Sequence, residues 1–169
     1  IHPRKNVHRL ITAFSDFKAQ TQSPARLLIA GRFAWQSGPV KSAYEASAFQ
    51  EDIDLLGFVP DKDLPALMGA AKGFVYPSLF EGFGLPLLEA MEADVPVITS
   101  NVSSMPEVAG QAALLIDPGN TTALARALIA LDGNVSLRAS LVEKGRLQRR
   151  QYSWDRTAAI VYENLAQLF

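Results

Sequence analysis

The chain has 169 residues, 49% of them hydrophobic and 20% charged, a composition that forms a core and excludes a disordered or fibrous protein. Sixteen basic and seventeen acidic residues give a net charge of −1, so the sequence offers no overall basic surface for nucleic acid. The lack of cysteine excludes redox thiols, zinc–thiolate sites and iron–sulfur sites. We expect one domain over residues 1–169. Because the chain begins with Ile1 in what reads as a loop, we expect a piece of a longer protein.

Short apolar segments alternate with amphipathic segments along the chain. In chain order, the pattern predicts a helix over 7–17, a strand over 27–30, a loop and weak helix over 33–50, a strand over 53–59, a helix over 64–71, a strand over 73–76, a helix over 85–93, strands over 95–99 and 113–116, and three helices that begin near 120, 136 and 153. Asp61 or Asp63, Asn120 and Ser153 are the expected caps of their helices.

Strands that are apolar on both faces and separated by helices are typical of an α/β fold. We predict a Rossmann-like, doubly wound parallel sheet that is covered on both sides. Ligands of such sheets bind beyond the carboxyl ends of the strands. A ligand is therefore expected at the loops that follow Ala30, Leu56, Tyr76, Thr99 and Ile116.

The loop after Tyr76 carries the strongest chemical pattern. Gly82 and Gly84 allow the backbone to approach a ligand closely, and Pro86 suits the first turn of a helix. Free backbone N–H groups and the positive end of the helix dipole favour a phosphate there. Glu81 precedes the helix and Glu89 lies about one turn inside it, so carboxylates flank the expected diphosphate and can accept hydrogen bonds from sugar and ribose hydroxyls.

A plain structural interpretation competes with this one. The two glycines alone would make a tight turn, and Leu87 occupies the position of the third glycine of a dinucleotide-binding loop. The spacing of the carboxylates, the proline and the strand–loop–helix context favour the ligand site.

The E-x(7)-E element from Glu81 to Glu89 resembles the signature of the retaining glycosyltransferases of GT-B architecture, which have two facing Rossmann-like domains (glycosyl transferases group 1). Matching segments extend over the whole chain: Arg4-Lys5-Asn6, Leu56-Gly57-Phe58-Val59-Pro60, Pro96-Val97-Ile98 and Tyr152-Ser153-Trp154. The chain is thus similar to the carboxyl-terminal, donor-binding domain of that family.

The resemblance implies a role for each matching residue. It implies that Lys5, with Arg4 beside it, contacts the donor diphosphate and that Glu81, the catalytic candidate, contacts the transferred sugar. Backbone N–H groups of the loop would hold sugar and phosphate, Glu89 would bind the ribose, and the backbone near Val59 would read the base. The loop residues are Gly82, Phe83, Gly84 and Leu85.

Two departures from the family pattern carry expectations about the fold. Asp94 stands where a helix-ending glycine is usual, and aspartate tolerates left-handed backbone. The family's first strand, which lies mid-sheet before the Arg4-Lys5 loop, is missing from this chain, so we expect either that other residues or another chain supply it or that the sheet is distorted.

Other polar groups favour structural roles. Asp52-Ile53-Asp54 and Asp61-Lys62-Asp63 resemble metal-binding pairs, but their positions indicate surface or capping residues, and no metal site is predicted. His8 is expected on a solvated helix face, whereas His2 lies near the expected phosphate site. Arg146, Arg149 and Arg150 are expected on a solvated face, with an anionic membrane surface as the alternative partner.

The predicted function is that of the donor-binding domain of a retaining glycosyltransferase. The expected donor is a GDP- or UDP-linked sugar, with GDP-mannose first because Pro3-Arg4-Lys5-Asn6 resembles mannosyltransferases. An acceptor saccharide or lipid-linked glycan would bind the missing amino-terminal domain, so this chain alone is expected to transfer nothing. We expect no cofactor and a cytoplasmic location, with peripheral contact at the inner membrane face as an option. The alternatives are a non-catalytic signalling or nucleotide-binding module and a nucleotide-sugar epimerase.

Overall fold

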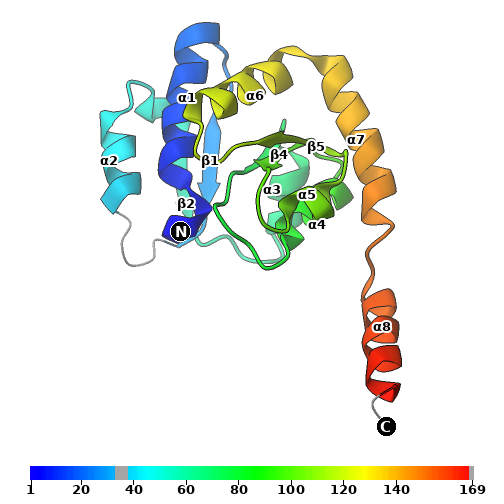
Figure 1. Cartoon of the computed structure of the whole chain (residues 1–169). Helices are drawn as coiled ribbons and strands as arrows, with labels where there is room; N and C mark the ends of the chain where they lie inside the picture. Colours follow the sequence, from blue (N-terminus) through cyan, green and yellow to red (C-terminus); the bar gives the residue numbers. More distant parts are fainter. Residues whose placement is uncertain (33–37, 168–169) are drawn as a thin grey trace.

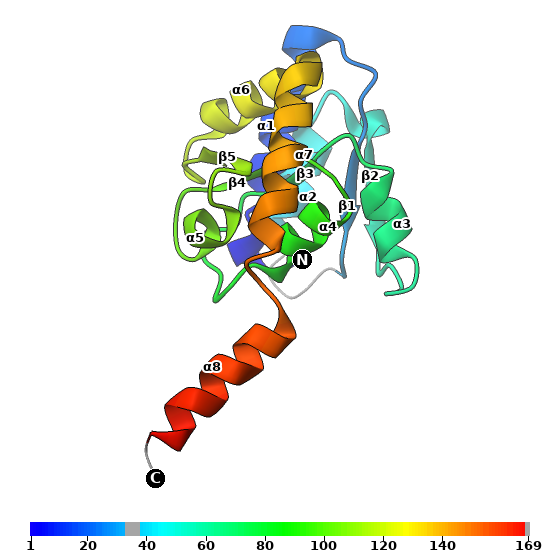
Figure 2. The same cartoon turned by 90° about the vertical axis from the view of Figure 1, so that its right-hand side faces the viewer.

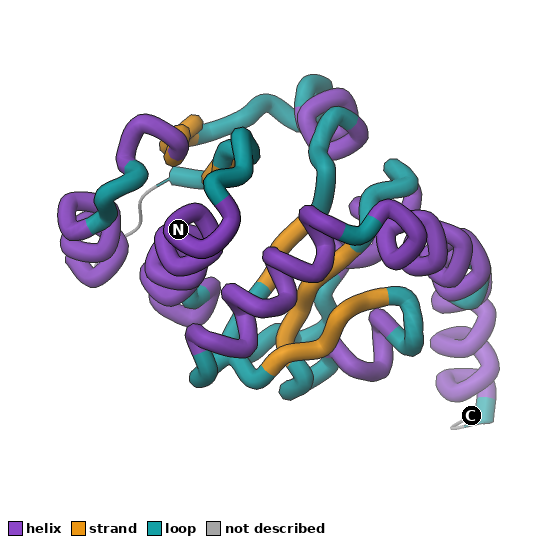
Figure 3. Tube along the Cα trace, turned by 90° about the horizontal axis from the view of Figure 1, so that it is seen from above, coloured by secondary structure: helices purple, strands orange, loops and turns teal. Residues whose placement is uncertain are grey.

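Five parallel strands form two separate sheets in the computed structural model, which describes residues 1–32 and 38–167. The first sheet pairs β1 (Leu27–Ala30) with β2 (Ile53–Gly57). The second has the order β3-β4-β5, formed by β3 (Phe74–Tyr76), β4 (Val97–Ser100) and β5 (Ala113–Ile116). Figure 3 shows the two sets of strands apart from each other. The α/β class with parallel strands is as predicted, and the split agrees with the expected lack of a mid-sheet strand.

The split changes the burial of the strands. All four residues of β4 are buried, as expected for a strand covered on both faces. In the first sheet, Leu28 is 47% exposed and Leu55 is 37% exposed, so the prediction of burial on both faces is wrong for β1 and β2. β2 also ends at Gly57 rather than at residue 59, because Gly57 has φ +67° and leaves the extended conformation.

Helices surround both sheets (Figures 1 and 2). They are the 3₁₀ segments η1 (Pro3–Lys5) and η2 (Gln50–Asp52) and the α-helices α1 (Val7–Thr21), α2 (Gly38–Ala46), α3 (Leu64–Gly69), α4 (Leu85–Glu92), α5 (Met105–Ala109), α6 (Thr121–Gly133), α7 (Val135–Arg149) and α8 (Trp154–Ala166). The short α5 was not predicted, because five residues give too little periodicity. Part of the loop predicted over 33–50, residues 33–37, lies outside the described residues.

Two of the three predicted caps are confirmed. The side chains of Asn120 and Ser153 accept hydrogen bonds from Ala123 N and Arg156 N. Asp63 stands at the N-cap position of α3, but its side chain makes no capping hydrogen bond, so the prediction of an aspartate cap is wrong there.

Helix α1 contacts both sheets through neighbouring positions on its buried side. Leu10 belongs to the cluster that contains Ile98 of β4 and residues of α6, whereas Phe14 belongs to the cluster that contains Ile29 of β1. Leu27 of β1 packs against both clusters. Because the sheets share no hydrogen bonds, these side chains supply the contact between them.

The carboxyl end of α4 is held by arginines of α7. Asp94 has φ +57°, the left-handed conformation expected there, and its carboxylate binds Arg146 at 2.7 and 2.9 Å. Arg149 Nη1 donates to the carbonyls of Met91 at 3.1 Å and Glu92 at 2.9 Å. Cations are favourable at a helix carboxyl end, so two members of the predicted basic cluster have a structural role within this chain.

Helix α8 extends away from the rest of the structure in both views (Figures 1 and 2). None of its residues is buried, and Trp154 is 76% exposed. Among the described residues, no helix has the length and apolar character needed to cross a membrane.

Candidate donor-binding site

The loop at η1 is fastened to the loop after β3 by a buried asparagine. Asn6 is fully buried with φ +58°, and its amide donates to the carbonyls of Pro77 at 3.1 Å and Pro118 at 2.8 Å. The N–H of Leu79 in turn donates to the carbonyl of Arg4 at 2.7 Å. These bonds bring two segments that are far apart in the sequence into one site. Asparagine suits the position because it tolerates left-handed backbone and supplies two donors.

Lys5 and Glu81 form the charged centre of this site. Lys5 Nζ lies 2.7 Å from Glu81 Oε1 and also donates to Tyr76 Oη at 2.5 Å. The ammonium lies 4.6 Å from the centre of the Tyr76 ring, which adds a cation–π contact. Arg4 is more exposed and reaches Glu81 Oε2 at 3.6 Å. The structure therefore brings three of the predicted residues, Arg4, Lys5 and Glu81, together.

The carboxylate of Glu81 is buried yet ionised. Burial alone would raise its pKa, but hydrogen bonds and the positive charge of Lys5 outweigh it, so the pKa of Glu81 lies below its ordinary value. Burial raises the pKa of the Tyr76 phenol, although Lys5 acts in the opposite direction. At neutral pH the site thus holds a carboxylate beside an ammonium, which is suited to hydrogen-bonding sugar hydroxyls and countering phosphate charge.

The loop between Glu81 and α4 presents backbone donors. Gly84 is the N-cap of α4 with φ +104°, which requires glycine, and a Cβ there would lie 3.4 Å from Leu87 Cδ1. A Cβ on Gly82 would meet no atom within 4 Å. In the part of the chain that the structure describes, the N–H groups of Gly82, Phe83 and Gly84 have no acceptor. The start of α4 therefore offers N–H groups without an acceptor in the chain, and their binding of a phosphate stays a prediction.

Glu89 lines a pocket of about 950 Å³ that runs along α4 from Leu85 to Ala93. Phe83 and Leu85 of the loop line the same pocket. Its other described lining residues come from α3, α4, α7 and the segment around the start of α8: Asp61, Leu64, Pro65, Met68, Gly69, Leu88, Glu92, Ala93, Arg149, Tyr152, Ser153, Trp154 and Thr157. Mostly apolar walls with a few charged groups are usual for small-molecule sites.

Val59 is the predicted residue that the structure connects least to the others. It is half-buried in the loop after β2 and is not among the described residues that line the pocket. Asp61, two residues later, does line it, so the loop reaches the edge of the pocket. The role of the backbone near Val59 stays a prediction.

Asp52, Asp54 and His2 have partners within the chain. Asp52 pairs with Lys18 at 2.9 Å and Asp54 with Arg26 at 2.9 Å. His2 Nδ1 accepts from the N–H of Arg4 at 3.2 Å, which places it beside the site. Burial, followed by the charge of Arg9, lowers the pKa of His8. Within residues 1–32 and 38–167, no group of three or more metal-ligating side chains is present.

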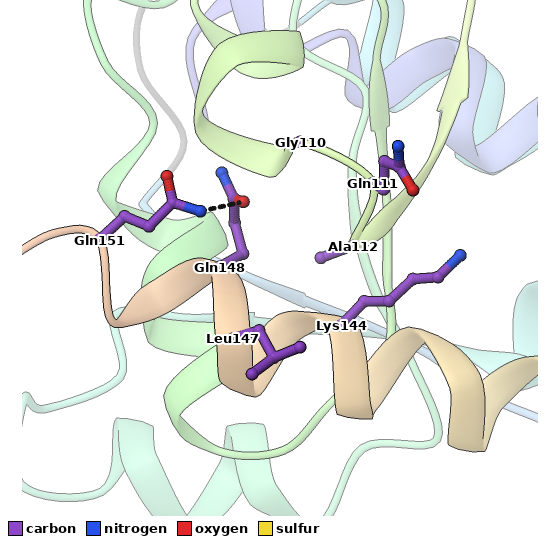
Figure 4. A pocket seen from close by; sticks show the side chains of 7 residues that line it. All are labelled: Gly110, Gln111, Ala112, Lys144, Leu147, Gln148 and Gln151. Atoms are coloured by element: carbon purple, nitrogen blue, oxygen red, sulfur yellow. Dashed lines mark hydrogen bonds between the residues drawn. The ribbon is translucent and has the colours of Figure 1, made fainter.

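A second pocket, of about 360 Å³, lies between the end of α5 and α7 (Figure 4). Gln151 donates to Gln148 Oε1 at 3.1 Å, and Gln148 donates to the carbonyl of Val108 at 3.1 Å. The Gln148 amide thus satisfies a carbonyl near the carboxyl end of α5, and Gln151 holds Gln148 in place. None of the predicted site residues lines this pocket, and its polar groups have a structural role.

Four residues have a role in the site that the sequence did not predict. They are Asn6, which hydrogen-bonds two loops, Tyr76 beside Lys5, and Ser103 and Ser104, which bind the backbone of the loop that contains Glu81. Ser103 Oγ donates to the carbonyl of Glu81 at 2.6 Å, and Ser104 Oγ donates to that of Phe83 at 2.7 Å. The position of Ser103 and Ser104 could have indicated them, because the loop after Thr99 was expected at the carboxyl edge of the sheet.

Comparison with known proteins identifies the family of the chain. The model of the family described as glycosyl transferases group 1 matches residues 1–148. Over 155 residues the chain is 39% identical to the O-antigen chain mannosyltransferase B of Escherichia coli, covering 92% of this chain and 41% of the relative. It is 33% identical over 170 residues to the phosphatidyl-myo-inositol mannosyltransferase of Mycobacterium leprae (strain TN), covering 97% of this chain and 44% of the relative.

The fold is shared with solved glycosyltransferases. The sucrose-phosphate synthase of Thermosynechococcus elongatus superimposes with a TM-score of 0.84 at 25% identity, over 99% of this chain and 43% of that chain. The chain therefore spans less than half of the length of each of these three proteins.

Proposed function

Because this chain belongs to the glycosyl transferases group 1 family, we propose that it is the donor-binding part of a glycosyltransferase. The proposed reaction moves a sugar from a nucleoside-diphosphate sugar to an acceptor glycan or lipid-linked saccharide. The family assignment favours this function over a signalling module. The names of the mannosyltransferase relatives support mannose as the sugar and GDP-mannose as the first donor to test.

The Lys5–Glu81 pair at the start of α4 carries the proposal. Lys5 Nζ, 2.7 Å from Glu81 Oε1, supplies a fixed cation, and the loop supplies N–H groups and the positive end of the α4 dipole. Together these groups would stabilise the charge that develops on a departing diphosphate. This stabilisation comes from the chain's own groups, and the proposed reaction needs no cofactor.

The carboxylates take different parts in the proposed complex. Glu81, held by Lys5, would bind hydroxyls of the transferred sugar, whereas the exposed Glu89 would bind the ribose hydroxyls from the pocket. In the proposed retaining reaction, the acceptor attacks the anomeric carbon from the face that the diphosphate leaves. The acceptor's proton passes to the departing diphosphate. The acceptor would come from a part of the enzyme outside this chain, so the chain alone should bind donor without transferring sugar.

A titration of the chain with GDP and UDP tests the proposal. We expect weak binding of at least one of them, and we expect Glu89→Ala to weaken it by at least about 10-fold, because charge-assisted hydrogen bonds to the ribose are lost. Glu92→Ala is the matched control, since Glu92 lies on the same helix and lines the same pocket.

Three outcomes would each contradict a different part of the proposal. Binding of neither nucleotide would overturn the donor-binding function. Equal weakening by Glu92→Ala would remove the ribose role of Glu89. Rapid transfer of mannose from GDP-mannose by the chain alone would show that the acceptor site lies within it.

A further inference from the structure

Two serines after β4 bind the backbone of the Glu81 loop. Ser103 Oγ donates to the carbonyl of Glu81 at 2.6 Å and accepts from the N–H of the same residue at 3.2 Å. Ser104 Oγ lies 2.7 Å from the carbonyl oxygen of Phe83 and 3.0 Å from that of Glu81. A hydroxyl has one hydrogen, so the pairing that satisfies both carbonyls is Ser103 to Glu81 and Ser104 to Phe83.

Both serines depart from their usual local behaviour to make these bonds. Ser103 has φ +57°, a left-handed conformation that a serine rarely adopts. Ser104 occupies the N-cap position of α5, where a serine side chain ordinarily accepts a hydrogen bond from its own helix, yet it makes no such bond. The 101–104 turn is therefore arranged around the neighbouring loop.

The bonded carbonyls fix the direction of two N–H groups. In a planar trans peptide, the C=O of one residue and the N–H of the next point in opposite directions. All described peptide bonds are trans. The carbonyl of Glu81 turned toward Ser103 thus turns the N–H of Gly82 away, and the carbonyl of Phe83 turned toward Ser104 does the same for the N–H of Gly84.

We propose that Ser103 and Ser104 are positioning residues that aim the N–H groups of Gly82 and Gly84 at the diphosphate of the donor. This inference rests on the proposed function, and it deepens it by assigning the orientation of the loop to residues outside the E-x(7)-E element. The serines touch loop backbone rather than donor, so their effect should appear in recognition of the distal phosphate and not of the nucleoside.

The test compares a nucleoside diphosphate with its monophosphate. For the chain with Ser104→Ala, we expect the affinity for GDP or UDP, whichever binds the unaltered chain, to fall by about 3- to 10-fold, the effect of one lost hydrogen bond on the positioned donors. The affinity for GMP or UMP should stay unchanged. Ser104→Thr keeps the hydroxyl and should restore the diphosphate-to-monophosphate ratio.

Ser15→Ala is the matched control, because Ser15 Oγ bonds Ser47 at 2.8 Å and the carbonyl of Ile11 at 3.0 Å, within and beside α1. It should leave the ratio unchanged. A Ser104→Ala chain that keeps the full ratio overturns the inference, even if its melting temperature falls, because a purely structural serine would change stability alone.

A measurement on the unaltered chain covers the case of a variant that does not fold. The amide resonances of Gly82 and Gly84 should shift strongly with the diphosphate and little with the monophosphate. Equal shifts with both ligands, or none, overturn the inference. If the unaltered chain binds neither diphosphate, the proposed function fails first, and that failure is visible without any variant.

Discussion

Lys5 Nζ lies 2.7 Å from Glu81 Oε1 although 76 positions separate the two residues in the chain. The pair connects the loop before α1 to the loop before α4. It therefore holds the two loops together and also supplies the charged groups of the site. Glu81 is 8% exposed and Lys5 is 29% exposed, which makes the interaction less screened than a surface ion pair.

The pair predicts a pH-dependent stability. The pKa of Glu81 is lowered in the folded chain, so the carboxylate stabilises the fold fully above its ordinary pKa of 4.5 and loses this effect as the pH falls through the lower, folded value. Glu81→Gln should reduce the free energy of unfolding by about 1–3 kcal/mol at pH 7. Thermal melts at pH 7 and at successively lower pH should show a difference that narrows below pH 4.5. A difference independent of pH would contradict the ion-pair explanation.

Asn6 should be among the most sensitive positions for stability. Asn6→Ala leaves the carbonyls of Pro77 and Pro118 without their buried donor, and we expect a loss of about 2–4 kcal/mol in urea unfolding. Gln22→Ala is the matched control, since Gln22 also has positive φ (+53°) but is exposed. Asn6→Gly separates the contribution of the side-chain hydrogen bonds from that of the left-handed backbone. Glycine adopts this backbone without strain, so the Gly variant should be nearly as unstable as the Ala variant if the hydrogen bonds dominate.

Gly82→Ala should separate binding from folding. A Cβ at Gly82 meets no protein atom within 4 Å, and the residue is exposed. The melting temperature should therefore stay within a degree or so of the original, while affinity for the nucleoside diphosphate falls by about 10-fold if the donor packs on the loop. Gly133→Ala, which also meets no atom within 4 Å, should leave the affinity unchanged. Unchanged affinity in the Gly82 variant would place the donor elsewhere.

Arg149 should stabilise α4 from α7. Arg149→Ala removes the donor to the carbonyls of Met91 and Glu92, and we expect a loss of about 0.5–1.5 kcal/mol in denaturant unfolding. Arg150→Ala, at an exposed neighbouring position, serves as the control and should be neutral. Equal effects of the two substitutions would show that general charge, rather than the two carbonyl contacts, matters.

Local chemistry made part of the site predictable. Gly84 and Pro86 indicated the start of α4, and Glu81 and Glu89 were expected on either side of it because their spacing is short and lies within one strand–loop–helix unit. The family resemblance placed Lys5 and Glu81 in one site, but their direct contact was not predicted, since no local rule connects residues 76 positions apart.

Tertiary packing decided the rest. Ser103 and Ser104 bond to the backbone of another loop. Every residue has a backbone carbonyl, so no sequence pattern indicates these bonds. The exposure of Leu28 and Leu55 depends on the split between the sheets and not on the strands' own composition. Arg146 and Arg149 were expected on a solvated face because their partners lie at and just after the carboxyl end of α4, more than fifty positions earlier.

The position of α8 has a thermodynamic consequence. Trp154 and Thr157 at the start of α8 line the same pocket as Glu89, and Tyr152 meets Phe83 of the loop edge-on at 5.6 Å. A change in the direction of α8 would therefore change the walls of the pocket. Thermodynamic linkage is reciprocal. A ligand that binds the pocket more tightly when α8 has one direction must stabilise that direction, and it does so by the difference between its two binding free energies. For a helix α8 that can change direction, occupancy beside Glu89 and that direction would be coupled.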